Sequence, residues 1–184
     1  KDSLVAVPLY IDIALMFYRD DLLRKFSDYP ELKKQLDESI TWEKFIELSK
    51  RFNINTNPFY IFQADDYEGL ICSFTELMAN QNNPVVDANG NLKLDTPEGK
   101  KSLQLLVDLV NKYNASPKSV TYLKENESYN LFAKDNGVFV RSWPSMMDDD
   151  NEFMSAEMKS NLRMAPMPHF KGSKPGSVYG GWNL

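Results

Sequence analysis

The fold is decided by residues 129–147, YNLFAKDNGVFVRSWPSMM. This stretch predicts the end of a helix, a tight turn at 135–137, and a buried strand at 138–140 that stops abruptly at Trp143 and Pro144. The proline cannot continue a central strand. Because open α/β sheets bind their ligands at the carboxyl ends of strands, Trp143 is the first residue that we expect to contact a ligand.

The composition sets limits on the class of protein. The chain has 184 residues, enough for one sizeable domain or two small ones. Its 42% hydrophobic and 26% charged residues are ordinary for a soluble globular protein. The net charge of −5 comes with no basic stripe to neutralise phosphates, so neither nucleic acid nor an anionic membrane surface is an expected partner. No apolar run approaches the ~18–20 residues that a membrane span needs.

The two ends of the sequence do not look like natural termini. Lys1 is not an initiator methionine, and 180–184, GGWNL, resembles a turn that enters a strand. We therefore expect residues 1–184 to form one domain that belongs to a longer protein. Any targeting segment would lie outside this domain.

Strands and helices alternate along the chain. An extended segment is expected at 4–10, and strands are expected at 14–18, 59–62, 138–140, 163–168 and 177–182. Helices are expected at 20–26, 41–52, 67–79, 96–113 and 121–134. This alternation predicts an α/β fold in which helices flank a sheet.

Two of these helices carry clear signals. Thr41 is a good N-cap for helix 41–52, in which Trp42 falls on the apolar face and is expected in the core. In helix 96–113 the spacing indicates an apolar face that lies on the sheet, formed by Leu103, Leu106, Val107 and Val110.

Several kinds of chemistry are missing from the sequence. There is no glycine-rich phosphate loop, no nucleophile elbow and no CxxC motif. The single cysteine, Cys72, lies in an apolar helical stretch, so we expect a buried thiol and no disulfide. The lone His169 excludes a multi-histidine metal site. We therefore expect no cofactor, no metal, no nucleotide and no catalytic residue.

Two acidic stretches resemble parts of metal sites. The segment 87–91, DANGN, matches half of a calcium loop but lacks the acidic ligand that closes such a loop. A β-hairpin turn at Asn89 and Gly90 is the better interpretation. The run of aspartates at 148–150 is typical of a solvated face or a helix start. Neither stretch predicts a metal site.

Aromatic and acidic residues gather at the predicted strand ends: Tyr10, Asp12, Asp65, Tyr67, Glu68, Trp143 and Trp182. This combination suits a carbohydrate. Sugar rings carry apolar C–H faces that lie against aromatic rings, and their hydroxyls donate charge-assisted hydrogen bonds to carboxylates. The local pattern also allows Tyr10 to pack in the core, Asp12 to cap a turn, and the acids at 65–68 to favour a helix N-terminus.

An ordered set of motifs gives a more specific hypothesis. The motifs run almost from end to end: VPLYIDIALMFYRDDLL, TWEKFIELSKRF, DDYEGLICSFTELMANQ, LDTPEGKKSLQLLVDLV, NLFAKDNGVFVRSWPSM, LRMAPMPHFKG and GGWNL. Together they resemble the extracellular solute-binding proteins of carbohydrate ABC transporters, in the maltose- and trehalose-binding branch. The resemblance implies a two-lobed fold of the periplasmic binding protein-like II type, in which a central mixed sheet is flanked by helices. Residues 1–184 would form most of the C-terminal lobe.

The resemblance also implies which residues bind sugar. Positions near the hinge are matched by Tyr10 and Asp12, an acid–aromatic cluster by Asp65, Tyr67 and Glu68, and stacking tryptophans by Trp143 and Trp182. Gly180 and Gly181 would let the backbone approach the ligand closely.

A protein of this class is a binding module and not an enzyme. It would capture a sugar or oligosaccharide, close by a hinge motion and dock on the permease subunits of the transporter. We expect a monomer that lies outside the cytoplasmic membrane, in the periplasm or at the cell surface. The full-length protein would then be a candidate lipoprotein, held at the membrane by a lipid anchor.

Two other hypotheses stay open. A glycoside hydrolase would pair Asp65 or Glu68 with Asp148 or Asp12 as acid and base, at the separation that retaining or inverting enzymes require. A purely structural interaction domain would bury its tryptophans away from any groove.

Overall fold

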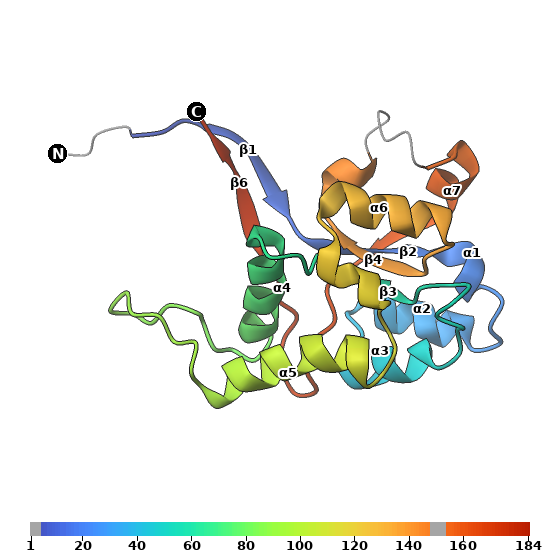
Figure 1. Cartoon of the computed structure of the whole chain (residues 1–184), viewed down its shortest axis with the longest axis horizontal. Helices are drawn as coiled ribbons and strands as arrows, with labels where there is room; N and C mark the ends of the chain where they lie inside the picture. The colour runs from blue at the N-terminus through green and yellow to red at the C-terminus, as the bar shows by residue number, and fades with distance from the viewer. Residues whose placement is uncertain (1–4, 148–153) are drawn as a thin grey trace.

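The computed structural model of the chain describes residues 5–147 and 154–184. A four-stranded sheet lies in the body of the molecule with helices around it (Figure 1). A two-stranded ribbon projects from this body and carries both described ends of the chain (Figure 1). The predicted α/β fold, with a sheet flanked by helices, is confirmed.

The strands are β1 (Pro8–Ile13), β2 (Leu15–Arg19), β3 (Tyr60–Ile61), β4 (Phe139–Ser142), β5 (Leu162–Ala165) and β6 (Tyr179–Asn183). The α-helices are α1 (Asp20–Leu23), α2 (Tyr29–Asp37), α3 (Trp42–Ser49), α4 (Glu68–Ala79), α5 (Pro97–Asn111), α6 (Glu125–Lys134) and α7 (Ala156–Asn161). Short 3₁₀ turns form η1 (Lys118–Tyr122) and η2 (Pro144–Met147).

The stretch 129–147 contains β4, one of the two inner strands of the sheet. The sheet order is β3-β4-β2-β5, and every residue of β4 is buried. β3 runs parallel to β4, whereas β2 is antiparallel to both β4 and β5, so the sheet is mixed as predicted. β4 extends further than expected because Arg141 and Ser142 pair with Met16 and Leu15 of β2.

An aromatic cluster between α3 and the sheet forms the core. Phe45 lies at its centre, with ring centroids 4.7 Å from Phe59 and 4.9 Å from Phe139. Trp42 packs edge-on against Phe45 at 5.6 Å and is 3% exposed. The prediction that Trp42 belongs to the core is therefore confirmed.

The ribbon pairs β1 with β6 in antiparallel register. Tyr10 lies opposite Trp182, and Asp12 lies opposite Gly180. The chain then passes through the buried Ala14 into β2. Tyr10 and Asp12 thus lie within a strand that starts later than the predicted extended segment 4–10. The alternative that Tyr10 packs in the core is wrong, since the residue is 48% exposed.

Helix α6 starts later than predicted. The expected helix 121–134 is interrupted because Leu123 and Lys124 adopt extended backbone angles. Its first residues belong instead to the 3₁₀ turn η1, and α6 begins at Glu125. This break places Glu125 in the first turn of a helix, where the sequence pattern had placed it in the interior.

The predicted apolar face of α5 is confirmed in part, since Leu106 and Val110 are buried. Leu103 and Val107 are 57% and 45% exposed, whereas Leu105 and Leu109 are buried. The buried face packs against α4, and Ser102 on this face accepts a hydrogen bond from Gln81 at 2.9 Å. Helix α5 therefore packs on a neighbouring helix, and its buried leucines join the same hydrophobic cluster as the sheet.

The remaining bounds show smaller differences. The predicted helix 20–26 ends at Leu23, and β3 is shorter than the predicted strand 59–62. Helices α2 and α7 were not predicted; the burial of Leu32 and Leu36 anchors α2. The hairpin turn at Asn89 and Gly90 is confirmed, since Val86 and Leu92 form a β-bridge on either side of it.

Among the described residues there is no group of three or more His, Cys, Asp or Glu that could hold a metal ion. The aspartates at 148–150 lie outside the described residues. None of the helices within 5–147 and 154–184 is both long enough and apolar enough to span a bilayer.

Candidate ligand-binding site

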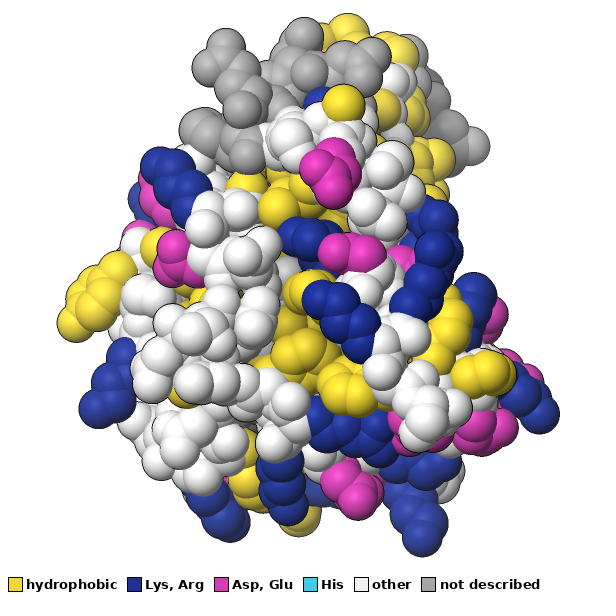
Figure 2. Space-filling model, turned by 90° about the vertical axis from the view of Figure 1, so that its right-hand side faces the viewer, with side chains coloured by type: hydrophobic (Ala, Val, Ile, Leu, Met, Phe, Trp, Pro, Cys, Tyr) yellow, Lys and Arg dark blue, Asp and Glu magenta, His cyan; other side chains and the backbone are white. Residues whose placement is uncertain are grey.

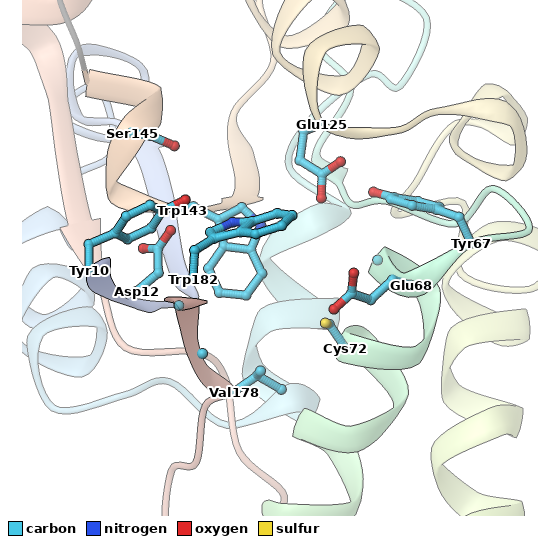
Figure 3. A pocket seen from close by; sticks show the side chains of 13 residues that line it. Tyr10, Asp12, Tyr67, Glu68, Cys72, Glu125, Trp143, Ser145, Val178 and Trp182 are labelled. Carbon is cyan, nitrogen blue, oxygen red and sulfur yellow. The ribbon is translucent and has the colours of Figure 1, made fainter. Parts of the chain in front are cut away.

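A pocket of about 610 Å³ lies where the ribbon, the end of β4, and the first turns of α4 and α6 meet. The ribbon and the β4 end contribute Tyr10, Asp12, Trp143, Ser145, Val178, Gly180, Gly181 and Trp182. The two helices and the residue before α4 contribute Tyr67, Glu68, Gly69, Cys72 and Glu125. Figure 3 shows these two groups as facing walls, one mainly aromatic and one mainly acidic.

The aromatic wall comes from strands that end at the pocket. Trp143 directly follows β4, and Pro144 at the start of η2 ends the strand there. Tyr10 and Trp182 are cross-strand partners in the ribbon, so the pairing itself sets them side by side. The Trp182 side chain is 67% exposed, so its ring is open to a ligand.

Gly181 fixes the close contact within the ribbon. Its φ is +144°, and a Cβ at this position would lie 2.1 Å from the carbonyl oxygen of Tyr10. A residue with a side chain would therefore both strain the backbone and push β1 away from β6. Gly180 lines the same pocket, but a Cβ there would meet nothing within 4 Å.

The acidic wall begins where α4 begins. Tyr67 precedes the helix and folds over Gly69, where an added Cβ would lie 2.1 Å from the Tyr67 hydroxyl oxygen. Burial and the nearby Glu125 carboxylate raise the pKa of Tyr67 above its ordinary value, so the phenol stays protonated at neutral pH. Glu68 and Glu125 occupy the first turns of α4 and α6.

All of the predicted site residues except Asp65 line this pocket. The backbone carbonyl of Asp65 accepts the N–H of Tyr67 at 2.8 Å, and this tight turn directs the two side chains differently. The Asp65 carboxylate lies 3.9 Å from Lys124 Nζ, while Tyr67 contributes to the pocket. The expectation that Asp65 belongs to the site is therefore not supported by its position.

The pocket also contains five residues that were not predicted from the sequence: Gly69, Cys72, Glu125, Ser145 and Val178. Cys72 lies one helical turn after Glu68 on α4, so the spacing from a predicted site residue could have found it. Glu125 was hidden by the wrong helix start. For Ser145 and Val178, only their nearness in sequence to Trp143 and Gly180 gives any signal.

Cys72 is half-buried rather than buried, and it lines the pocket. Burial raises the pKa of its thiol above the ordinary value. The group is therefore a neutral thiol at neutral pH.

The charges of the pocket are of one sign. Its ionisable lining residues include the carboxylic acids Asp12, Glu68 and Glu125, and no lysine or arginine lines it among the residues that the structure describes. Asp12 Oδ1 accepts the N–H of Ile13 at 3.0 Å. Such a surface can accept hydrogen bonds from hydroxyl groups while flat rings lie against its aromatic wall.

A family model described as bacterial extracellular solute-binding protein matches residues 1–184, so the chain belongs to this family. The resemblance found in the sequence motifs is confirmed. Proteins of this family are substrate-binding proteins.

Individual relatives agree with this assignment. The chain is 29% identical over 183 residues to a probable ABC transporter-binding protein from Deinococcus radiodurans, covering 99% of this chain and 43% of that protein. It is 22% identical over 139 residues to an arabinooligosaccharide-binding protein from Halalkalibacterium halodurans, covering 75% of this chain and 29% of that protein.

Among solved structures, maltose-bound MalE3 from T. maritima has a TM-score of 0.81 at 30% identity, covering 97% of this chain and 44% of that chain. A solute-binding protein from Thermotoga lettingae bound with alpha-D-tagatose has the same TM-score, 0.81, at 22% identity, which shows the shared fold. The chain thus spans less than half the length of the relatives that it matches.

Proposed function

We propose that this chain is most of the C-terminal lobe of a two-lobed protein, the substrate-binding component of a carbohydrate ABC transporter. The observation that carries the proposal is the pocket, in which Tyr10, Trp143 and Trp182 face the carboxylates of Glu68 and Glu125. Family membership and the sugar-bound relatives support the same conclusion. The ligand is a sugar or an oligosaccharide.

The two walls bind different parts of the sugar. The apolar face of a sugar ring lies against Trp143 and Trp182, which removes both surfaces from water. The hydroxyl groups at the ring edge donate hydrogen bonds to Asp12, Glu68 and Glu125, each contributing about 1.5–3 kcal/mol. Since the ionised carboxylates accept and do not donate, the hydroxyl protons of the sugar fix its orientation.

In the complete protein, a second lobe covers the open side of the pocket, and closure of the two lobes presents the loaded protein to the permease. The name of the family places such proteins outside the cytoplasm. A location in the periplasm or at the cell surface, with or without a lipid anchor, follows from the proposal, as does a monomeric state.

A glycoside hydrolase is the competing function, because the pocket holds several carboxylates in a space that fits a sugar. Of the acids first considered, Asp65 lies outside the pocket, and Asp148 lies outside the described residues. Membership of a family of binding proteins favours binding over turnover.

The test is calorimetric titration of the full-length protein with a panel of mono- and oligosaccharides, repeated with the 184-residue chain alone. A binding protein gives heats that saturate, and the best ligand identifies the substrate class. A heat flow that continues after each injection would mean hydrolysis. Absence of heat with every sugar of the panel would rule out the proposal for the full-length protein.

Trp143→Ala tests the assignment of the site. Loss of the stacking surface should lower sugar affinity by at least about tenfold. The unfolding temperature should change little, because Trp143 lies at the pocket and outside the aromatic core. Tyr122→Ala is a matched control, since Tyr122 is 80% exposed and lies outside the pocket. Unchanged affinity in Trp143→Ala would remove Trp143 from the site.

A further inference from the structure

A buried ion pair lies directly behind the pocket. Arg141 on β4 is 0% exposed and Glu76 on α4 is 2% exposed. The guanidinium donates to Glu76 through Nη2 at 2.8 Å and Nε at 3.2 Å, and to Gln63 Oε1 through Nη1 at 3.1 Å. These bonds fix the plane of the guanidinium in one orientation.

This fixed plane lies against Trp143. The guanidinium carbon of Arg141 is 4.6 Å from the centroid of the Trp143 ring. Arg141 lies in β4 and Trp143 directly follows the strand, two residues further along the chain. Because Arg141 is fully buried while Trp143 lines the pocket, the indole covers the guanidinium on its pocket side.

The same network reaches the acidic wall. Gln63 is 0% exposed and donates through Nε2 to Ser128 Oγ at 2.7 Å and to the Arg141 carbonyl at 3.0 Å. Ser128 in turn donates to the carbonyl of Glu125 at 2.7 Å. A continuous chain of hydrogen bonds therefore ties the strand that bears Trp143 to the helical turn that bears Glu125.

Stability alone does not require a charge at this position. Replacing a buried ion pair with apolar side chains of similar volume is often neutral or stabilising. Burial opposes the guanidinium charge, but Glu76 outweighs it and holds the pKa of Arg141 above its ordinary value. The residue is thus a permanent cation under the ring that faces the ligand, and cation–π attraction acts on that ring.

We propose that Arg141, clamped by Glu76 and Gln63, is a positioning residue that holds the Trp143 indole in the orientation in which it stacks on a sugar. The inference rests on the proposed function, and it adds a residue that makes no contact with the ligand. Lysine cannot replace this arginine, because a single ammonium lacks the planar fork that binds both partners while lying flat against the ring.

The test is a double-mutant cycle in the full-length protein, with the best sugar of the panel as ligand. Arg141→Lys should weaken binding by about fivefold to thirtyfold. In the Trp143→Leu background, Arg141→Lys should lower sugar affinity by less than about twofold, because the ring that Arg141 positions is absent there. An equal cost in both backgrounds would mean that Arg141 acts only through stability, and no cost in either would also overturn the proposal.

A second readout does not depend on sugar binding. Indole N–H signals in NMR spectra of the ligand-free protein report Trp42, Trp143 and Trp182 separately. Arg141→Lys should shift and broaden the Trp143 signal while the core residue Trp42 stays unchanged. Glu76→Gln, which keeps an oxygen acceptor and removes the charge, should give a smaller change of the same kind. A Trp143 signal unchanged in Arg141→Lys would overturn the proposal even if no sugar of the panel binds.

Discussion

Trp182 and Tyr179 lie on the same strand of the ribbon and are almost equally exposed, at 67% and 68%. Of the two, Trp182 lines the pocket. Trp182→Ala should therefore lower sugar affinity by at least about fivefold, while Tyr179→Ala should leave it within about twofold. Calorimetric titration of both variants decides the question. Equal losses would show that the ribbon acts as a whole and that Trp182 does not stack on the ligand.

Cys72 offers a chemical probe of the pocket. Because burial raises the pKa of its thiol, little thiolate forms near neutral pH, and the rate of alkylation by iodoacetamide should rise only above the ordinary thiol pKa. The urea-unfolded chain should react faster at pH 8. Bound sugar should slow the alkylation of Cys72 in the folded protein further, since Cys72 lines the pocket. A rate that is unaffected by saturating sugar would place the ligand elsewhere.

At the scale of elements, the ribbon depends on one glycine. Gly181→Ala adds a methyl group 2.1 Å from the Tyr10 carbonyl oxygen at a φ of +144°. Such strain costs about 1–3 kcal/mol and separates the strands that pair Tyr10 with Trp182. Sugar affinity should fall by about tenfold or more.

Gly180→Ala is the control for this substitution. It adds the same methyl group one residue earlier, where nothing lies within 4 Å. Affinity should stay close to that of the unchanged protein. A similar loss in both variants would mean that the methyl group blocks the ligand rather than distorting the ribbon.

Elements with a clear local pattern could be predicted from the sequence. Thr41 caps α3 by accepting the N–H of Lys44, and the spacing of Trp42 and Phe45 gave the correct core face. The start of α6 could not be predicted in this way. Leu123 and Lys124 favour helices by propensity. Their backbone is nevertheless extended, and the Leu123 carbonyl accepts the N–H of Asp65 at 3.4 Å.

The pocket was predictable to the extent that its residues lie at the ends of strands. Tyr10, Trp143 and Trp182 are brought together by the ribbon and β4, where topology alone determines position. The acidic wall was harder to predict. A turn of the backbone excludes Asp65, and Glu125 enters from a helix whose start depends on packing.

At the scale of the whole molecule, charge should limit the range of ligands. The chain has a net charge of −5, and the pocket is lined by Asp12, Glu68 and Glu125. A uronic acid should therefore bind at least about tenfold more weakly than the matching neutral sugar at low ionic strength. The difference should narrow as salt screens the charges.

Titrations of the sugar and its uronic acid at two salt concentrations check this expectation. Glu125→Gln removes one of the repelling charges and should reduce the difference between the two ligands. Equal affinity for the neutral and the acidic sugar at low salt would contradict it.

One face of the molecule can be compared with the ribbon. The view in Figure 2 shows lysine and arginine side chains interspersed with acidic ones, with only small apolar areas between them. On the ribbon, Leu9, Ile11 and Trp182 are each more than half exposed, as are Ile71, Leu92 and Tyr122 elsewhere on the chain. Neighbouring exposed apolar side chains on one element are typical of an interaction surface.

The ribbon also determines where ligand preference can be altered. Trp143 lies against Arg141, and Arg141 is paired with Glu76 in the buried interior, so exchanging either member of this ion pair risks the integrity of the fold. Tyr10 and Trp182 project from strands that contribute no side chain to the hydrophobic core. Evolution, or a designer who wants a new sugar specificity, can therefore vary Tyr10 and Trp182 while Gly181 and the interior of the lobe stay the same.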